Sequence, residues 1–96
     1  MILVTAGIKS KSGERNKIIS KSKDLIESTR LESDCISYNL YESVEDVDLL
    51  LMFEQWKTTE ALESHMQTEH FKAFGAAIED FLAEELDITI YSAEKV

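Results

Sequence analysis

In the first third of the chain, the hydrophobic pattern changes from one typical of a strand to one typical of a helix. Residues 2–9 are almost all apolar or small, a pattern typical of a strand covered on both faces. After a turn over residues 10–14, apolar positions recur at helical spacing, which predicts a helix with one face in a core and one in water. We expect Ser12 to be its N-cap and Glu14 to lie in its first turn. The helical stripe consists of Ile18, Ser22, Leu25 and Thr29, flanked by Ile19 and Ile26.

Period-two alternation returns over residues 35–42, and residues 48–56 form a more deeply apolar strand. The acidic turn between them is short, so the two strands should pair antiparallel. Thr58-Thr59-Glu60 and Thr68-Glu69 are typical of helix starts, which predicts a helical unit broken in two. Residues 86–91 predict a closing strand. The first short helix carries Ala61, Leu62, His65 and Met66 on one side, and the second carries Phe71, Phe74, Ile78, Phe81 and Leu82.

The order βαββαβ predicts a single α+β domain over residues 1–96. Its expected architecture is ferredoxin-like, with helices on one face of a four-stranded antiparallel sheet. The third strand is apolar at both parities, because Leu49, Leu51 and Phe53 alternate with Leu50, Met52 and Trp56. One helix layer covers only one sheet face, so we expect a homodimer packed sheet to sheet.

Composition and charge narrow the classes of function. The 96 residues include 19 acidic and 10 basic side chains, a net charge of -9, which disfavours binding to nucleic acid. Residues 1–41 carry seven basic and five acidic side chains, whereas residues 42–96 carry three and fourteen. We interpret the acidic half as a solvated face rather than a docking surface for a cationic partner. No signal peptide or membrane-spanning run is expected, which favours a cytoplasmic protein.

Motifs for the common chemistries are missing from the sequence. There is no Gly-rich nucleotide loop, no Ser-His-Asp arrangement, and one cysteine, Cys35, which we expect to be a small buried hydrophobe at a strand edge. His65 and His70 are five residues apart, so on a continuous helix they point in different directions. We therefore expect no metal site and no cofactor.

A few side chains remain as candidates for chemistry. His65 shares a stripe with Leu62 and should point inward, toward the strand that ends in Trp56. A buried histidine with one satisfied hydrogen bond and a catalytic histidine both account for it. Tyr38 and Asn39 have opposite parity on their strand, so only one of them can face a cavity there. For His70 we prefer a role in the helix break and its cap to a functional one, and the three phenylalanines of the last helix are expected in the core.

The segment 53–74 resembles a hallmark of the antibiotic biosynthesis monooxygenase family, in particular its small bacterial quinol monooxygenases. The resemblance rests on Glu-x-Trp at residues 54–56, on Glu-x-His at residues 63–65 and on Thr-x-His at residues 68–70, followed by an aromatic-rich helix. Residues 32–38 also resemble the family's Glu-x-Gly-Cys-x-x-Tyr pattern. Asp34 replaces the glycine, and because Asp tolerates a left-handed backbone the turn should survive.

The resemblance implies a dimeric α/β barrel with a cavity between helices and sheet in each subunit. Its enzymes oxidise electron-rich phenols or quinols with molecular oxygen and use no flavin, metal or other cofactor. On that basis we expect His65 to be the base or hydrogen-bonding partner and Trp56 to be a wall of the pocket. Tyr38 and Asn39 are expected to position the substrate, with His70 as a second polar group.

The resemblance also leaves alternatives open. Heme-degrading relatives use an Asn, a Trp and a His at positions that correspond to Gly7, His65 and Gly75 here, which disfavours heme oxygenation. An isomerase that moves a proton on a small dicarbonyl compound is a second reading, because the scaffold supports such chemistry in related proteins. A non-catalytic ligand-binding or stress-response dimer with a vestigial cavity is a third.

Overall fold

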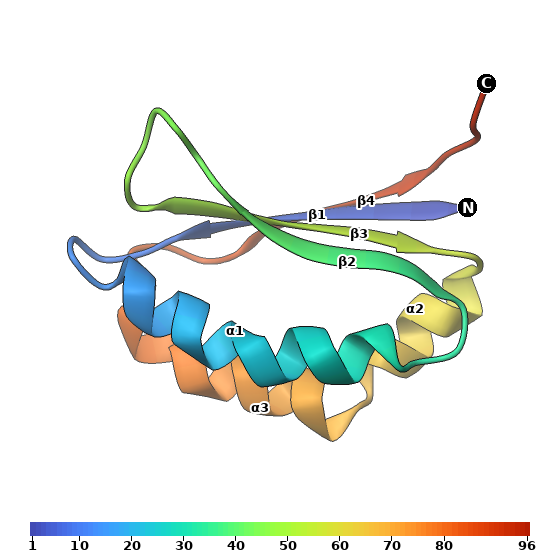
Figure 1. Ribbon diagram of the computed structural model, residues 1–96, viewed down its shortest axis with the longest axis horizontal. Coiled ribbons are helices and arrows are strands. Elements are labelled where there is room, and N and C mark those ends of the chain that lie inside the picture. The colour runs from blue at the N-terminus through green and yellow to red at the C-terminus, as the bar shows by residue number, and fades with distance from the viewer.

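A computed structural model describes residues 1–96 as four strands, three α-helices and one 3₁₀ turn (Figure 1). Along the chain the elements alternate as the hydrophobic periods predict, and the α3 helix runs directly into the 3₁₀ turn. Their bounds are β1 Ile2–Lys9, α1 Arg15–Arg30, β2 Cys35–Glu42, β3 Leu49–Trp56, α2 Thr59–Met66, α3 Glu69–Ile78, the 3₁₀ turn η1 Glu79–Phe81, and β4 Asp87–Ser92.

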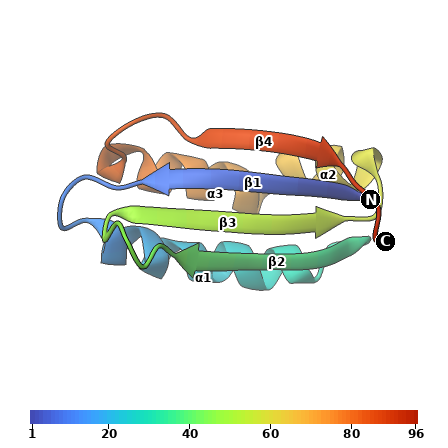
Figure 2. The same ribbon diagram turned by 90° about the horizontal axis from the view of Figure 1, so that it is seen from above.

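The strands form one antiparallel sheet in the order β2-β3-β1-β4, which confirms the ferredoxin-like α+β architecture (Figure 2). The register pairs Val4 of β1 with Glu54 of β3 and with Ile90 of β4. Glu54 in turn pairs with Tyr38 of β2. Because residues paired across antiparallel strands share a sheet face, these four side chains belong to one face.

All helices lie against one face of the sheet, and the core lies between the two layers (Figure 1). The buried α1 residues are Ile18, Ser22, Leu25 and Thr29, the stripe expected from the sequence. They meet the inward residues of the sheet, which include Val4, Ala6, Ile8, Leu50, Met52 and Trp56. Burial of this apolar surface is the main favourable contribution to the stability of the fold.

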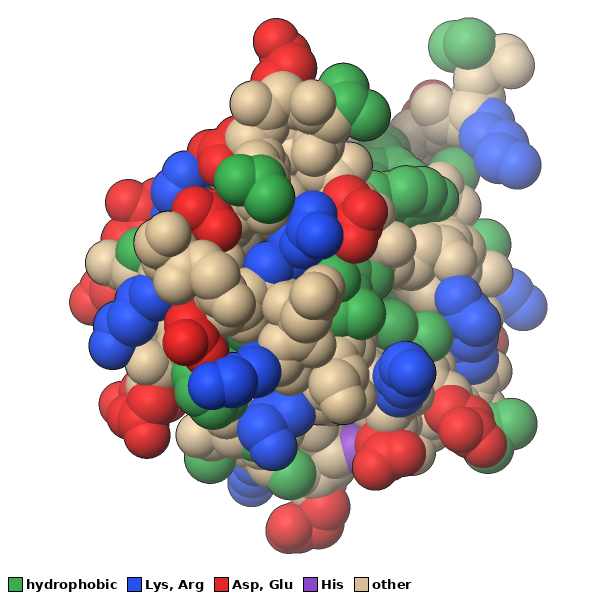
Figure 3. Space-filling view, turned by 60° about the vertical axis from the view of Figure 1, so that its left-hand side comes forward, with side chains coloured by type: hydrophobic (Ala, Val, Ile, Leu, Met, Phe, Trp, Pro, Cys, Tyr) green, Lys and Arg blue, Asp and Glu red, His purple; other side chains and the backbone are tan.

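The other face of the sheet has no helix over it. Leu49, Leu51, Tyr41 and Tyr91 are between 36% and 51% exposed there, although they are large and apolar or aromatic. Figure 3 shows hydrophobic side chains gathered between the β2–β3 hairpin and the C-terminal segment, where this face lies. The two parities of β3 therefore do face opposite ways, and one helix layer covers only one of them.

The start of α1 differs from the expectation. Glu14, not Ser12, is the N-cap residue, and it makes no side-chain capping hydrogen bond. Gly13 has a positive φ of 79°, which turns the chain between Ser12 and the helix and moves the serine away from the N-terminal N–H groups. The expected third and last strands each begin one residue earlier than the observed ones, a shift within ordinary fraying. None of the helices has the length and hydropathy to cross a membrane.

Candidate active site

A narrow apolar cavity lies between the inner face of the sheet and helices α2 and α3. Its volume is about 80 Å³, and 13 of its 16 lining residues are hydrophobic. Three titratable side chains lie in its wall: the carboxyl group of Glu54, the imidazole of His65 and the phenol of Tyr38. Ile88 and Ile90 of β4 also line the cavity but are 51% and 53% exposed, so it opens to solvent along β4.

His65 lies inside this cavity wall, on the inward side of α2, and is only 1% exposed. Its ring is surrounded by aromatic rings, with centroids 4.8 Å from Trp56, 5.1 Å from Phe71 and 5.3 Å from Tyr38. The Nδ1 atom lies 2.7 Å from Oε2 of Glu32, whereas Nε2 is buried and has no partner. One ring nitrogen is therefore anchored and the other is free.

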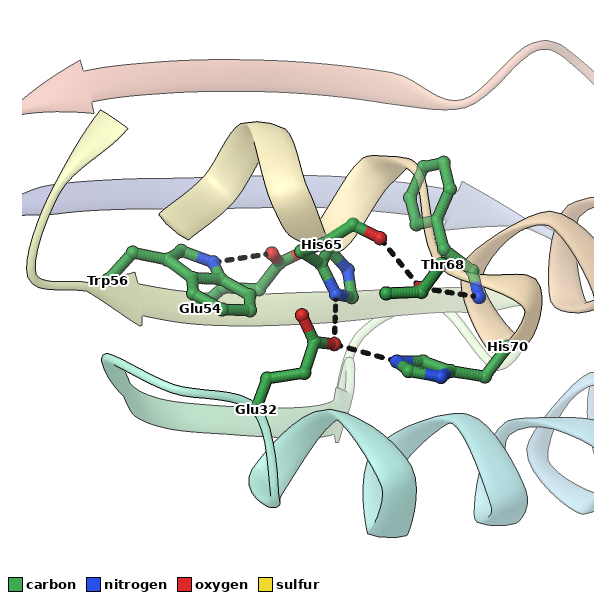
Figure 4. Close-up of polar contacts among 7 residues, drawn as sticks. Glu32, Glu54, Trp56, His65, Thr68 and His70 are labelled. Carbon is green, nitrogen blue, oxygen red and sulfur yellow. Dashed lines mark hydrogen bonds and ion pairs between the residues drawn. The ribbon is translucent and has the colours of Figure 1, made fainter. Parts of the chain in front are cut away.

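Glu32 joins the two histidines. It stands in the segment between α1 and β2, where Asp34 adopts the expected left-handed conformation with φ of 64°. Its Oε2 atom accepts the contact from His65 and also lies 2.6 Å from Nε2 of His70, so one oxygen lies between the two rings (Figure 4). The expectation that His65 and His70 point in different directions is therefore wrong.

The break between α2 and α3 explains this convergence. The hydroxyl of Thr68 donates to the carbonyl of His65 at 2.7 Å and accepts from the N–H of Phe71 at 3.3 Å. Thr68 thus closes one helix and caps the next, and the chain changes direction between the two histidines. Five residues on one continuous helix would have placed the rings on different sides.

Electrostatics determine which form His65 takes. Burial lowers its pKa from the usual 6.5, and the adjacent Glu32 carboxylate opposes that effect without cancelling it. The ring is therefore neutral near pH 7. The contact with Glu32 assigns the proton to Nδ1, which leaves the lone pair on Nε2 as an unshared base.

Glu54 is a second titratable group in the cavity wall. It is only 6% exposed, and its Oε1 atom accepts a hydrogen bond of 3.0 Å from the indole N–H of Trp56. Burial raises its pKa to about 7, with a smaller upward effect from Glu32, while the Trp56 hydrogen bond acts in the opposite direction. A carboxyl group in this state both gives and takes protons at neutral pH.

Of the two neighbours on β2, the structure selects Tyr38 for the cavity. Tyr38 is 3% exposed, lines the cavity and has a raised pKa because burial disfavours its anion, so the phenol keeps its proton. Asn39 is on the opposite face and does not line the cavity; its Oδ1 accepts a hydrogen bond from Arg30 at 2.8 Å. Asn39 is therefore removed from the candidate substrate-binding residues.

Trp56 and His70 occupy different positions relative to the cavity. Trp56 is fully buried behind His65 and Glu54, so it supports the wall rather than lining the open space. His70 shares Oε2 of Glu32 with His65, the two ring centroids lie 6.0 Å apart, and His70 lines a separate groove between α1 and α3. Cys35, at the start of β2, packs against the core and its pKa is raised mainly by burial, but it is half-buried rather than buried as expected.

Glu32, His65 and His70 are the residues that could hold a metal ion. One ligand atom from each lies within 4.8 Å of the others, and two histidines with one carboxylate are a ligand set for divalent transition metals. Here the two ring nitrogens and the carboxylate oxygen are engaged with one another. A bound ion would have to displace both hydrogen bonds and take the lone pair of Nδ1, leaving Nε2 protonated.

Two site residues were missed by sequence reasoning, Glu32 and Glu54. Glu54 shares the parity of Met52 and Trp56 on β3, so the alternation already placed a carboxyl group on the buried face. Glu32 begins the segment 32–38 quoted for the family resemblance, but its partners lie 33 and 38 residues away. No local pattern could have indicated that pairing.

Comparison with known proteins supports the family resemblance noted in the sequence. The family profile for antibiotic biosynthesis monooxygenases matches residues 1–77. The Escherichia coli protein named "Probable quinol monooxygenase YgiN" is 27% identical over a match 89 residues long, and the match covers 81% of this chain and 85% of that protein. The uncharacterized Synechocystis protein sll1783 is 38% identical over 90 residues, 94% of this chain, and the chain spans only 61% of that protein's length.

The fold is shared as well. A crystal structure of a conserved protein from Methanosarcina mazei Go1 superposes with a TM-score of 0.92 at 32% identity, covering 97% of this chain and 92% of that one. Similarity in sequence and fold thus extends over almost the whole chain. The chain belongs to the antibiotic biosynthesis monooxygenase family.

Proposed function

We propose that this protein is a cofactor-independent monooxygenase that oxidises a small dihydroxylated aromatic ring with molecular oxygen. The observation that carries the proposal is the Nε2 atom of His65, an unpartnered base on a residue in the wall of a mostly apolar cavity. The cavity, at about 80 Å³, is smaller than small-molecule sites of roughly 300–1,000 Å³, which favours a single flat ring. The name of the E. coli relative supports a quinol as substrate class.

The first step is removal of a hydroxyl proton by Nε2 of His65. The imidazolium that forms is stabilised by the Glu32 carboxylate at Nδ1, as a carboxylate stabilises a catalytic histidine in other enzymes. The resulting electron-rich anion passes one electron to oxygen, and the two radicals combine in a C–O bond. The proton on Nε2 then returns to the new peroxide.

The second step converts the ring hydroperoxide to a carbonyl group and water. The C–H proton at the peroxide carbon leaves, the O–O bond breaks, and the distal oxygen departs as water. For hydroquinone the balance is C₆H₆O₂ + O₂ giving hydroxybenzoquinone, C₆H₄O₃, and H₂O. The ring supplies all four electrons, so no external reductant is needed, and a dry apolar cavity protects the intermediates from side reactions.

Oxygen uptake with single-ring hydroquinones and catechols tests this proposal. We expect turnover by the native chain, a loss of at least about 100-fold in His65→Ala because the base is removed, and a smaller loss in Trp56→Phe. Ser64→Ala changes the exposed neighbour on α2 and should be neutral. EDTA should not reduce turnover, because Nδ1 of His65 and Nε2 of His70 are already engaged with Glu32.

Two outcomes would contradict the proposal. If His65→Ala were as active as the native chain, His65 would not be the base. If a dicarbonyl compound were converted under strict anaerobiosis and no hydroquinone consumed oxygen, the chain would be a proton-transferring isomerase. This second function is considered because His65 and Glu54, two groups that can transfer protons, both line the cavity.

We further propose that the working unit is a homodimer packed through the sheet face that carries no helix. The exposed apolar side chains of β2, β3 and β4 on that face support it, because such a patch is rarely left in water.

A further inference from the structure

The burial of Glu54 is unfavourable for the stability of this fold. It lies in mid-strand on the inner face of β3, and a buried carboxyl group with few partners either carries a large desolvation penalty as an anion or keeps its proton. An apolar residue such as Met52, two positions earlier on the same face, would avoid that cost. Buried ionisable groups that line a cavity are more often retained for chemistry than for stability.

The groups that face Glu54 show how it is held. Val4 of β1 and Tyr38 of β2 flank it in register, and His65 of α2 lies in the same cavity wall. Glu32 disfavours its charge, and no lysine or arginine contributes to its environment. The one donor is the N–H of Trp56, which can only donate, so Oε1 must accept and the proton belongs on Oε2.

We propose that Glu54 is the general acid of this cavity, the partner of the base His65, and that its Oε2–H binds and protonates an oxygen of the ligand. The inference rests on the proposed oxidation of a dihydroxylated ring. In the second step the Oε2 proton passes to the distal peroxide oxygen as the O–O bond breaks and water leaves. His65 takes the C–H proton and returns it to Glu54, so both groups end as they began.

The protonation states of the two groups support this division of roles. The pKa of Glu54 is raised to about 7, whereas that of His65 is lowered below its usual 6.5. Near neutral pH a substantial fraction of Glu54 therefore keeps its proton, while the lowered pKa of His65 favours the neutral imidazole. Two groups whose environments push their pKa values apart form an acid–base pair.

Trp56 is the only tryptophan of the chain and bonds directly to Glu54, so its fluorescence reports the protonation of that carboxyl group. We expect a fluorescence transition with a midpoint near pH 7, which disappears in Glu54→Gln and persists in His65→Gln. Glutamine keeps an acceptor for the indole N–H but does not titrate. Absence of the transition, or its persistence in Glu54→Gln, would overturn the proposal.

Phenol, which has one oxygen and is not a quinol, tests the contact with a ligand independently of turnover. Its affinity, read from Trp56 fluorescence, should fall about tenfold between pH 5.5 and pH 8.5 in the native chain, as expected for loss of one hydrogen bond from a donor of this kind. The affinity should be independent of pH in Glu54→Gln. Toluene, without an oxygen, should show a smaller fall, and an equal fall would refute the hydrogen bond.

Oxygen uptake then tests the acid step. Glu54→Gln should lower kcat by about 100-fold with little change in KM, and the decline in rate above pH 7 should disappear. A kcat within about threefold of native would exclude Glu54 as the acid. If no hydroquinone is oxidised but phenol binding shows the expected pH dependence, the oxidation is wrong and the proton-sharing contact stands.

Discussion

His65 uses its two ring nitrogens for different purposes, and this division depends on Glu32. Nδ1 is held by the carboxylate, while Nε2 stays free in the cavity wall. The same oxygen also contacts His70, whose side chain is 24% exposed and so lies nearer to solvent than His65. The carboxylate therefore fixes the tautomer and the ring orientation of His65 and raises its pKa.

Replacement of Glu32 should separate its charge from its shape. In Glu32→Gln an amide oxygen can still accept from Nδ1, but the negative charge that raises the pKa of His65 is gone. We expect kcat/KM to fall roughly 10- to 100-fold and its acidic limb to move to lower pH. Asp34→Asn, which changes a nearby carboxylate paired with Lys57, is the control. An unchanged acidic limb would show that Glu32 does not act through His65.

Glu54 makes stability depend on pH in an unusual direction. Its folded pKa of about 7 lies above the unfolded value of 4.5, so the folded state binds the proton more tightly and stability is lost as pH rises from about 4.5 to about 7. Glu54→Gln should remove this loss and so gain, relative to native, up to about 3 kcal/mol between pH 4.5 and pH 8. Chemical denaturation at both pH values measures it, and an equal difference at both would contradict the raised pKa.

For single residues, the sequence predicts which side chains are candidates for the cavity better than it predicts which side chains they contact. The helical stripe placed His65 toward the cavity, whereas parity showed only that one of Tyr38 and Asn39 could face it, and which one does depends on a bulge at Ile36. There Cys35 pairs with Trp56 and Ser37 with Gln55, so β2 advances two residues while β3 advances one. Uninterrupted alternation from Cys35 would have turned Asn39 inward. Nothing in the local sequence indicates that extra residue.

At the scale of elements, the short break between α2 and α3 determines the site. Thr68 joins the last carbonyl groups of α2 to the first N–H groups of α3, and this corner brings His65 and His70 to the same oxygen. Had the helix continued, Glu32 could have met only one of them. A loop of two residues thus decides the geometry of the polar cluster.

Two threonine caps offer a matched test of this corner. Thr58→Ala and Thr68→Ala each remove an N-cap and should each cost about 1 kcal/mol in free energy of unfolding. Only Thr68 also donates to the carbonyl of His65, so only Thr68→Ala should lower kcat, and Thr68→Ser should restore it. Equal kcat values in the two alanine variants would show that the corner does not position the base.

The elements themselves follow from hydrophobic period, which is why their order and faces could be predicted. The stripe of α1 is buried as expected, because residues spaced at the 3.6-residue period lie together on one face of the helix. The start of α1 could not be placed correctly, since Ser12 and Glu14 are both plausible caps and the choice depends on the backbone angle at Gly13. Element boundaries depend on such angles, whereas element types depend on many residues.

For the whole molecule, the uncovered sheet face is the feature with the largest consequence. Leu51 lies at its centre, paired with Gly7 of β1 and Tyr41 of β2. If two chains pack through this face, Leu51→Lys would bury a charge at the interface, and the dimer should dissociate. Light scattering after size exclusion should change from twice 10.9 kDa to 10.9 kDa.

Leu31→Lys is the control for this change, because Leu31 is also apolar and exposed but lies at the end of α1, away from the sheet face. It should leave the mass unchanged. A native chain of 10.9 kDa at micromolar concentration would rule out the dimer. The sequence predicted that one face would be uncovered, but it could not show what covers it, since a period of two reports only that both sides are apolar.

The cavity opening along β4 has a consequence for how such a protein can be modified. The groups proposed for chemistry come from residues 32–70, whereas the mouth is formed by Ile88 and Ile90 on an edge strand paired only with β1. Under the proposed function, the residues at the mouth and the proton-transfer groups therefore belong to separate stretches of the chain. A library randomised at positions 88 and 90 would therefore vary the size of ring that the cavity admits while the proposed proton-transfer groups stay intact.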